Sequence, residues 1–405
     1  MAIDQTDATR SSYGEVIANG QFRVVFTAST LAIAADTLRI VALSILVYSL
    51  TGSAFLSALA FGIIFLPQVV GSTFFGALAD RFPARRLIVS GYAMEAVTGL
   101  VIGFAHLPIG VMLAMVAVNA AIIAAFAGSR ARILVRILDG DAYVLARSML
   151  SLGGSAAQLV GLGAAGAMVG LLGPRHALLV SAAGHVISAL SCWLWLSRDP
   201  DPEPTRDQQR SVVRESLAGN KLLLGIPSVR RSMLSQWLPP TFIAGSESLI
   251  VAFALRHGYG TQAPGILLAG YPVGMILGDL VVGRCLTPQW RERLVPLLVA
   301  FMGIPLLVFA FHPSFVVAAV AIVVSGAGCA SALGQQRHFV EAVPPAYRGQ
   351  AFGLLGTGMM TVQGLGAILA GAASAVLDVG VTMAAFGALT GIGVATWLWA
   401  SQGRE

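Results

Sequence analysis

The chain has 405 residues, of which 56% are hydrophobic and only 11% are charged. Soluble domains carry about 25% charged residues, so this composition excludes a set of soluble domains and predicts an all-α membrane protein. The net charge of +6 comes almost entirely from arginines in short loops between apolar runs. That placement argues against nucleic acid as a partner and favours loops that lie beside a lipid bilayer.

The apolar runs predict twelve transmembrane helices. A bilayer core about 30 Å thick needs roughly 20 apolar residues per helix. Prolines inside several runs are compatible with this interpretation, because membrane helices tolerate them. The two short runs around residue 300 give the weakest signals. The expected spans are 23–49, 54–78, 87–105, 109–127, 148–170, 176–196, 231–255, 263–283, 294–311, 315–335, 351–374 and 379–400.

The basic residues predict the orientation of these spans. With the N-terminus inside, 22 of the 25 lysines and arginines fall in cytoplasmic segments, Arg175 and Arg256 fall on the opposite side, and Arg39 lies within a span. Loops on the cytoplasmic side carry such an excess. We therefore expect a multi-pass protein of the inner (plasma) membrane with both termini in the cytoplasm.

The chain divides into two halves around a polar, proline-rich stretch at its midpoint. We expect an N-terminal six-helix bundle at 1–200, a cytoplasmic linker at 201–228 and a C-terminal six-helix bundle at 229–405. Residues 212–226 suggest either a short amphipathic helix at the membrane surface or the start of the next span.

An internal repeat supports the two halves. Gly62 matches Gly265 and Arg81 matches Arg284 at an offset of 203, and the stretch 132–166 parallels 337–371 at 203 to 205. Six spans per half give both copies the same orientation. Such repeats are typical of secondary transporters, whose substrate site lies between the halves near the bilayer midplane.

The sequence resembles transporters of the major facilitator superfamily over essentially the whole chain. The resemblance lies in FRVVFTASTLAIAADTLRIVALSILVYSLTGSA near the start, GALADRFPARR after the second span, SRARILVRILDGDA after the fourth and PPAYRGQAFGLL entering the eleventh. Within this superfamily it is most similar to the drug-exporter branch that includes the enterobactin exporter and the macrolide efflux proteins. This resemblance implies two pseudo-symmetric six-helix bundles.

The resemblance also implies a conformational latch in the loop GALADRFPARR. Pro83 and Ala84 depart from the family pattern there, which puts one basic contact in doubt. Asp80 is expected to face the start of the eleventh helix, where the helix dipole favours its charge. The expected latch residues are Gly76, Asp80, Arg81, Arg85, Arg86, Arg132, Asp279, Arg284 and Arg348.

The fifth span carries glycines at 161, 163 and 166 but has Leu162 where exporters often have proline. The resemblance favours an antiporter motif, while close helix packing explains the same glycines.

Ionisable residues within spans are expensive and mark functional positions. Asp36 and Arg39 are neighbours on one face of the first span. They predict either a proton-coupling carboxylate with its modulator or a structural ion pair. Glu247, on the repeat-related seventh span, is expected at similar depth, and we expect it to pair with Arg39 in one conformational state. Glu95 in the third span is a further candidate for the cavity or for another ion pair.

Uncharged polar and aromatic residues within spans are weaker candidates for the substrate cavity. The polar side chains commonly form interhelical hydrogen bonds, and several aromatic ones are packing residues. His185 is among the polar residues noted in spans. The tentative cavity residues are Gln68, Asn119, Gln158, Gln236, Gln363, Phe61, Phe65, Trp237, Phe242 and Tyr271.

No enzyme chemistry is evident. The only lysine, Lys221, follows Asn220, so no phosphate-binding Gly-Lys-Ser/Thr loop exists, and the three cysteines show no metal spacing. We expect no catalytic residues, no metal and no cofactor beyond a proton gradient.

The resulting hypothesis is a proton-coupled exporter of small amphiphilic compounds, namely drugs, antibiotics or siderophores, acting as a monomer. An importer of a small solute on the same fold is the alternative. A channel or receptor would not require the repeated halves.

Overall fold

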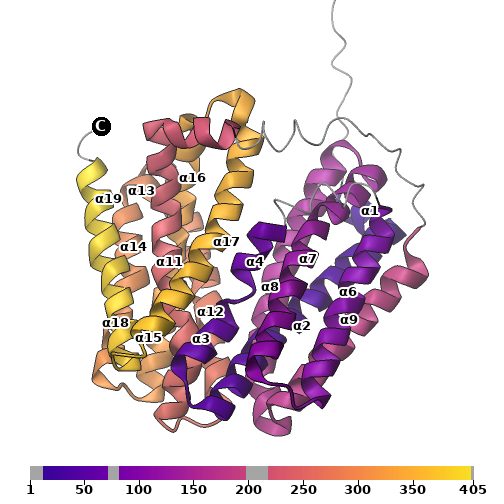
Figure 1. Cartoon of the computed structure of the whole chain (residues 1–405). Coiled ribbons are helices and arrows are strands. Elements are labelled where there is room, and N and C mark those ends of the chain that lie inside the picture. The colour runs from indigo at the N-terminus through magenta and orange to yellow at the C-terminus, as the bar shows by residue number, and fades with distance from the viewer. Residues whose placement is uncertain (1–11, 72–81, 198–217, 403–405) are drawn as a thin grey trace, which may run out of the picture.

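The computed structural model describes residues 12–71, 82–197 and 218–402. Every regular element in these ranges is a helix, which confirms the all-α class. Figure 1 shows the helices in two groups that stand side by side, one from each half of the chain.

The N-terminal group starts with a short helix and continues with long ones. Within it, the second predicted span is divided into α3 and α4. The elements are α1 Tyr13–Ala18, α2 Gly20–Thr51, α3 Ala54–Gly62, α4 Phe65–Val70, α6 Ala84–Phe104, α7 Ile109–Ile137, α8 Gly140–Leu172 and α9 Pro174–Trp195.

The C-terminal group repeats this pattern with more interruptions. Short 3-10 or π segments divide several of its spans. The elements are α11 Pro227–Arg256, α12 Ala263–Cys285, α13 Pro288–Arg293, α14 Val295–Gly303, η2 Ile304–Phe311, α15 Phe315–Ala327, η3 Gly328–Ala330, α16 Ser331–Ala342, η4 Pro345–Tyr347, α17 Arg348–Ala373, α18 Val379–Ala388, η5 Leu389–Val394 and α19 Ala395–Gln402.

The helix lengths agree with the predicted spans. Within the described ranges, nine helices are long and apolar enough to cross a membrane. Three shorter apolar helices, Ala54–Gln68, Ile109–Ile123 and Val295–Phe311, occupy the positions of the other three expected spans. The weak signals near residue 300 therefore mark real helices.

Local sequence signals set several helix ends. The Asn19 side chain caps α2 by accepting from the backbone N–H groups of Gln21 and Phe22. Gly52 ends the same helix in the left-handed region at φ 62°, which glycine adopts without a steric penalty. Asp378 caps α18 in the manner of Asn19.

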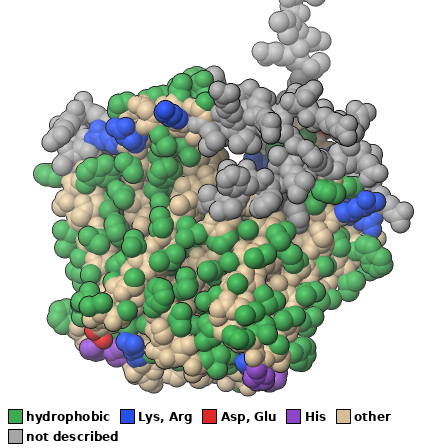
Figure 2. Space-filling view, in the orientation of Figure 1, with side chains coloured by type: hydrophobic (Ala, Val, Ile, Leu, Met, Phe, Trp, Pro, Cys, Tyr) green, Lys and Arg blue, Asp and Glu red, His purple; other side chains and the backbone are tan. Residues whose placement is uncertain are grey.

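The outer surface of the molecule matches a lipid environment. Figure 2 shows hydrophobic side chains over the middle of the visible face, with arginine, lysine and histidine side chains at its upper and lower rims. Large apolar side chains such as Leu171, Trp195, Phe311 and Val376 are well exposed. A belt of this kind on a soluble protein would drive aggregation.

The two halves pack tightly at the end of the molecule opposite the chain termini. Helices α3 and α4 contact α17, and α8 contacts α12. A Cβ placed on Gly265 would lie 2.2 Å from the backbone nitrogen of Gly166, so the backbones meet where any side chain would separate them. Nearby, Arg256 Nε donates to the Tyr48 hydroxyl at 3.1 Å. These contacts close the interface between the halves at that end.

The segment before α11 also packs into the C-terminal half. Residues 218–225 are helical, and Leu223 is fully buried in a cluster with Met233 and Phe339. Asn220 Oδ1 accepts from Gln350 Nε2 at 3.0 Å. The second part of the expected linker is thus a packed helix. The domain boundaries at 200 and 228 stay a prediction.

Candidate functional site

Three helices of the N-terminal half bring four charged or titratable side chains together. Asp36 and Arg39 lie on α2, Glu95 on α6 and His185 on α9. Small residues allow α9 to approach α2 closely: a Cβ on Gly184 would lie 3.0 Å from the Ala35 Cβ.

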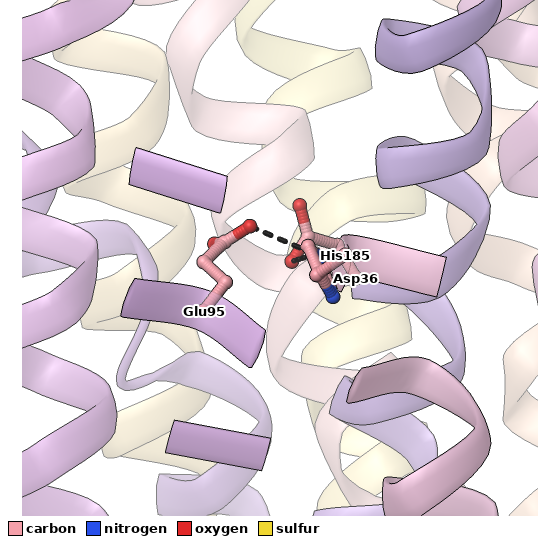
Figure 3. A group of neighbouring side chains, drawn as sticks. All are labelled: Asp36, Glu95 and His185. Atoms are coloured by element: carbon pink, nitrogen blue, oxygen red, sulfur yellow. Dashed lines mark ion pairs between the residues drawn. The ribbon is translucent and has the colours of Figure 1, made fainter. Parts of the chain in front are cut away.

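The side chains of this charge cluster are in direct contact. Arg39 Nη2 lies 2.7 Å from Asp36 Oδ1 and 3.2 Å from Glu95 Oε1. His185 Nε2 lies 2.8 Å from Glu95 Oε2 and 3.2 Å from Asp36 Oδ1. Figure 3 shows Glu95 approaching the other two residues from a separate helix. Each carboxylate therefore contacts both basic groups.

Because most of the cluster is buried, its charges must be neutralised by one another. The side chains of Arg39, Glu95 and His185 are 8%, 6% and 0% exposed, whereas that of Asp36 is 35% exposed. A buried charge is stable only when it is paired and hydrogen-bonded. The cluster therefore has one open edge, at Asp36, and is otherwise enclosed by helices.

Sequence reasoning anticipated part of this cluster. The spacing of three residues placed Asp36 beside Arg39, but the contact of Glu95 with Arg39 depends on how α6 packs. His185 was noted only as a polar residue. The position of His185 on α9 could have indicated its role, because it shares a helix face with Ser181 and Ser188. This face packs against α2, since both serine hydroxyls donate to carbonyls of α2.

A cavity of about 510 Å³ lies between the two halves. Its wall combines apolar side chains with amides and one carboxylate, that of Glu247. Expected cavity residues on this wall are Phe61, Phe65, Gln158, Gln236, Glu247, Tyr271 and Gln363. Wall residues that sequence reasoning missed include Thr37, Ser235, Gln335, Met275, Met302, Met359 and Met360.

Among the described residues that line the cavity, Glu247 is the acidic one, and none of the others is an arginine, lysine or histidine. Among the described residues, the Glu247 carboxylate has no ion pair with Arg39, whose contacts are with Asp36 and Glu95. Nearby on the wall, the Tyr271 hydroxyl lies 2.8 Å from Cys329 Sγ. The cavity therefore presents one acidic group in otherwise neutral surroundings.

The sequence matches the profile of the Major Facilitator Superfamily over residues 25–286, which is more than half of the chain. The chain belongs to the Major Facilitator Superfamily. It is accordingly a multi-pass membrane protein and a secondary transporter of small molecules, not an enzyme. No curated protein matches the chain in sequence.

Solved structures of this superfamily share the fold. A mutant of the nucleoside transporter NupG is similar with a TM-score of 0.71 and 15% identity, over 94% of this chain and 99% of that chain. Two structures of a POT family transporter each give a TM-score of 0.68 over 95% of this chain and 96% of theirs. One, in complex with a thioalcohol-conjugated peptide, is 11% identical, and the other, with 5-aminolevulinic acid, is 12% identical. At such identities the similarity shows the fold alone.

Some expected cavity residues lie elsewhere in the superfamily fold. Trp237 donates from Nε1 to the Leu355 carbonyl at 3.0 Å, and Phe242 packs edge to face against Phe386. Asn119 lines a separate surface pocket with Thr98, and Gln68 on α4 is not part of the cavity wall. A shift of one or two positions along a helix moves a side chain to another face, which a single sequence does not reveal.

The expected latch residues are only partly described. Gly76, Asp80 and Arg81 lie outside the described residues. Arg85 donates to the Trp193 carbonyl on α9, and Arg132 donates to Ser129 Oγ at 3.1 Å. The remaining members, Arg86, Asp279, Arg284 and Arg348, are exposed. Their part in a latch stays a prediction.

The glycines of the fifth span are packed differently from one another. A Cβ on Gly161 would meet Ala34 and Thr37 of α2, and one on Gly166 would meet Gln262 and Gly265 of the other half. Gly163 faces open space. Close helix packing accounts for two of the three positions.

Proposed function

We propose that this transporter exports small amphiphilic compounds, namely drugs, antibiotics or siderophores, across the inner membrane in exchange for protons. The observation that carries this proposal is the position of Glu247 on the wall of a cavity between two pseudo-symmetric halves. A carboxylate that no cation among the described wall residues neutralises can bind a proton and release it when substrate binds. The apolar, methionine-rich wall adapts to substrates of different shapes.

The closed interface fits alternating access. The halves meet at Gly166 and Gly265, whereas the cavity is bounded by residues nearer the chain termini, such as Ser235 and Gln335. With the termini in the cytoplasm, as the arginine distribution supports, this is the state that loads substrate for export. We further propose that the transporter acts as a monomer whose halves, 1–200 and 229–405, move about this interface.

The test is transport in inverted membrane vesicles with an imposed proton gradient. The probes are a fluorescent lipophilic dye, a macrolide and a catecholate siderophore. We expect gradient-dependent uptake of at least one probe, and at least a tenfold loss in Glu247→Gln. Glu341→Gln, an exposed carboxylate outside the cavity, is the matched control and retains uptake.

Two results would contradict this proposal. Gradient-dependent uptake by right-side-out vesicles whose outside is acidic would establish proton-coupled import. Undiminished gradient-driven uptake by Glu247→Gln would remove the coupling role from this carboxylate.

A further inference from the structure

We propose that His185 is the proton-binding residue of the N-terminal half. It holds one proton on Nε2 between Asp36 and Glu95, and this proton reaches water through Asp36. The use of this proton in transport rests on the proposed function, whereas its presence on the ring does not.

The contacts of the two ring nitrogens define their roles. His185 Nδ1 lies 2.9 Å from the Ser181 carbonyl oxygen. A carbonyl oxygen only accepts, so Nδ1 carries a hydrogen. Nε2 lies 2.8 Å from one carboxylate oxygen of Glu95 and 3.2 Å from one of Asp36. A neutral ring with its hydrogen on Nδ1 would leave the Nε2 lone pair close to these two negative oxygens.

A proton on Nε2 removes this repulsion. In water, imidazole is more basic than a carboxylate by about two pKa units, so the proton belongs on the ring when both groups compete for it. Nε2 is aligned with neither oxygen as a hydrogen bond. It lies between the two carboxylates, in the geometry of an ion pair shared by both.

The charge of the cluster supports the same protonation state. The groups facing His185 are Asp36 from α2 and Glu95 from α6. Arg39 contacts the same two carboxylates, and Tyr92 lies three residues before Glu95. With a neutral histidine, two carboxylates and one guanidinium leave a net charge of −1 in a buried site. One proton brings the net charge to zero, and neutrality is strongly favoured away from water.

A metal ion is a poorer occupant of this site. Asp36, Glu95 and His185 offer ligand atoms within 4.8 Å of one another. The Arg39 guanidinium, however, contacts both carboxylates. A divalent cation would therefore face a fixed positive charge and leave the cluster at +1.

The exit of the proton follows from exposure. His185 is fully buried, and Asp36 is the one member of the cluster with substantial exposure. On the same helix, Thr37 and Ile40 line the cavity, and Asp36 lies one residue before Thr37 and one turn before Ile40. The step breaks the Nε2–H bond, forms an O–H bond on Asp36 and then returns the proton to water. The cluster is left at −1 until a proton returns.

The test is nitrogen NMR of the full-length protein, labelled with 15N-histidine and placed in lipid nanodiscs. We expect both ring nitrogens of His185 to be protonated at pH 8. The His185 signal is assigned by its loss in His185→Gln. If His185→Gln does not fold, the signal is assigned by its change of chemical shift in Glu95→Gln. A neutral ring with hydrogen only on Nδ1 would overturn the proposal.

His176 provides a matched internal reference. Its Nδ1 makes the same contact with the carbonyl four residues earlier, at 2.8 Å, and none of the described carboxylates contacts its Nε2. Its Nδ1 signal therefore shows the chemical shift of a ring nitrogen held by a carbonyl alone, against which the two His185 signals are compared. A His185 Nε2 signal typical of an unprotonated ring nitrogen contradicts the proposal.

Variants of the carboxylates test the charge argument. Asp36→Asn and Glu95→Gln each reach neutrality without the proton, so we expect the His185 ring to become neutral in both. Glu247→Gln, which alters a carboxylate outside the cluster, should leave the His185 signal unchanged. Retention of the imidazolium in both cluster variants would refute the argument from charge.

Water exchange in the same samples tests the exit. We expect the Nε2 proton to exchange with water faster than the Nδ1 proton, which the Ser181 carbonyl holds. The reverse order would overturn the route through Asp36. The NMR measurements of protonation and of water exchange need no substrate. Failure of the export proposal in vesicles is therefore distinguishable from failure of the proposal for His185.

Discussion

The two halves of this transporter treat buried charge in opposite ways. On α2, Asp36 and Arg39 belong to a four-member cluster in which every carboxylate touches two basic groups. On the repeat-related α11, Glu247 lies on the cavity wall, where none of the described lining residues is cationic. The duplicated architecture therefore does not impose duplicated chemistry. One half surrounds its carboxylates with basic groups, and the other places a carboxylate on the wall of the cavity.

Arg39→Gln should have the largest effect on stability. It leaves the buried Glu95 and the partly exposed Asp36 with only His185 as a basic partner, and breaking a buried ion pair costs about 3 to 5 kcal/mol. We expect a large loss of thermal stability in detergent, measured by tryptophan fluorescence. Arg86→Gln, at an exposed position, is the control and should change stability by no more than about 0.5 kcal/mol. Similar melting curves for both variants would show that Arg39 is not needed to neutralise Asp36 and Glu95.

A double-mutant cycle should detect coupling within the cluster. Groups in direct contact show interaction free energies of about 0.5 to 3 kcal/mol, so Glu95→Gln combined with His185→Gln should be less destabilising than the sum of both changes. The same cycle with Glu247→Gln and His185→Gln should be additive. Denaturant titrations of the variants supply the free energies. Additivity in the first cycle would mean that the 2.8 Å contact carries no coupling.

One buried serine hydrogen bond in each half allows the stability of uncharged packing to be compared between the halves. Ser181 Oγ donates to the Ala35 carbonyl at 2.7 Å in the N-terminal half, and Ser246 Oγ donates to the Met383 carbonyl at 3.1 Å in the C-terminal half. Each substitution by alanine should cost about 1 kcal/mol, as measured by thermal unfolding. A much larger loss of stability from the alanine substitution in one half would mean that the halves differ in general rigidity, and not only in how their buried charges are paired.

Glu247→Gln should have the smallest effect on stability. The change removes a carboxylate that no basic group on the cavity wall compensates, so we expect a melting temperature equal to that of the unmodified chain or slightly above it. Thermal unfolding in the same detergent provides the measurement. A marked loss of stability would reveal that Glu247 has a structural partner and would remove the contrast between the halves.

The fold was largely predictable because its determinants lie along the chain. Each span shows as an apolar run, and the repeat shows as matches at one offset. Even the pair Asp36 and Arg39 is local, since three residues bring two side chains onto one helix face. Glu95 and His185 are far apart in sequence, and only the packing of α6 and α9 against α2 joins them.

The cavity wall was harder to predict for a related reason. Gln236 faces the cavity, whereas its neighbour Trp237 bonds to the Leu355 carbonyl. The rotation of α11 about its own axis decides between them, and an apolar run surrounded by lipid and protein on all sides carries little record of that rotation. Gln335 was missed because it lies at the end of its expected span, where a polar residue looks like a boundary.

The adjacent prolines of α11 have a consequence for what the wall offers a bound molecule. Pro239 and Pro240 lie inside the helix and on the cavity wall, and neither has a backbone N–H. The carbonyls of Ser235 and Gln236, one turn earlier, therefore lose the donors that a regular helix would supply. Both residues belong to the same wall. Two residues of the wall thus have carbonyls without their usual helical donors, and we expect guests with N–H or O–H groups to benefit where these carbonyls are within reach.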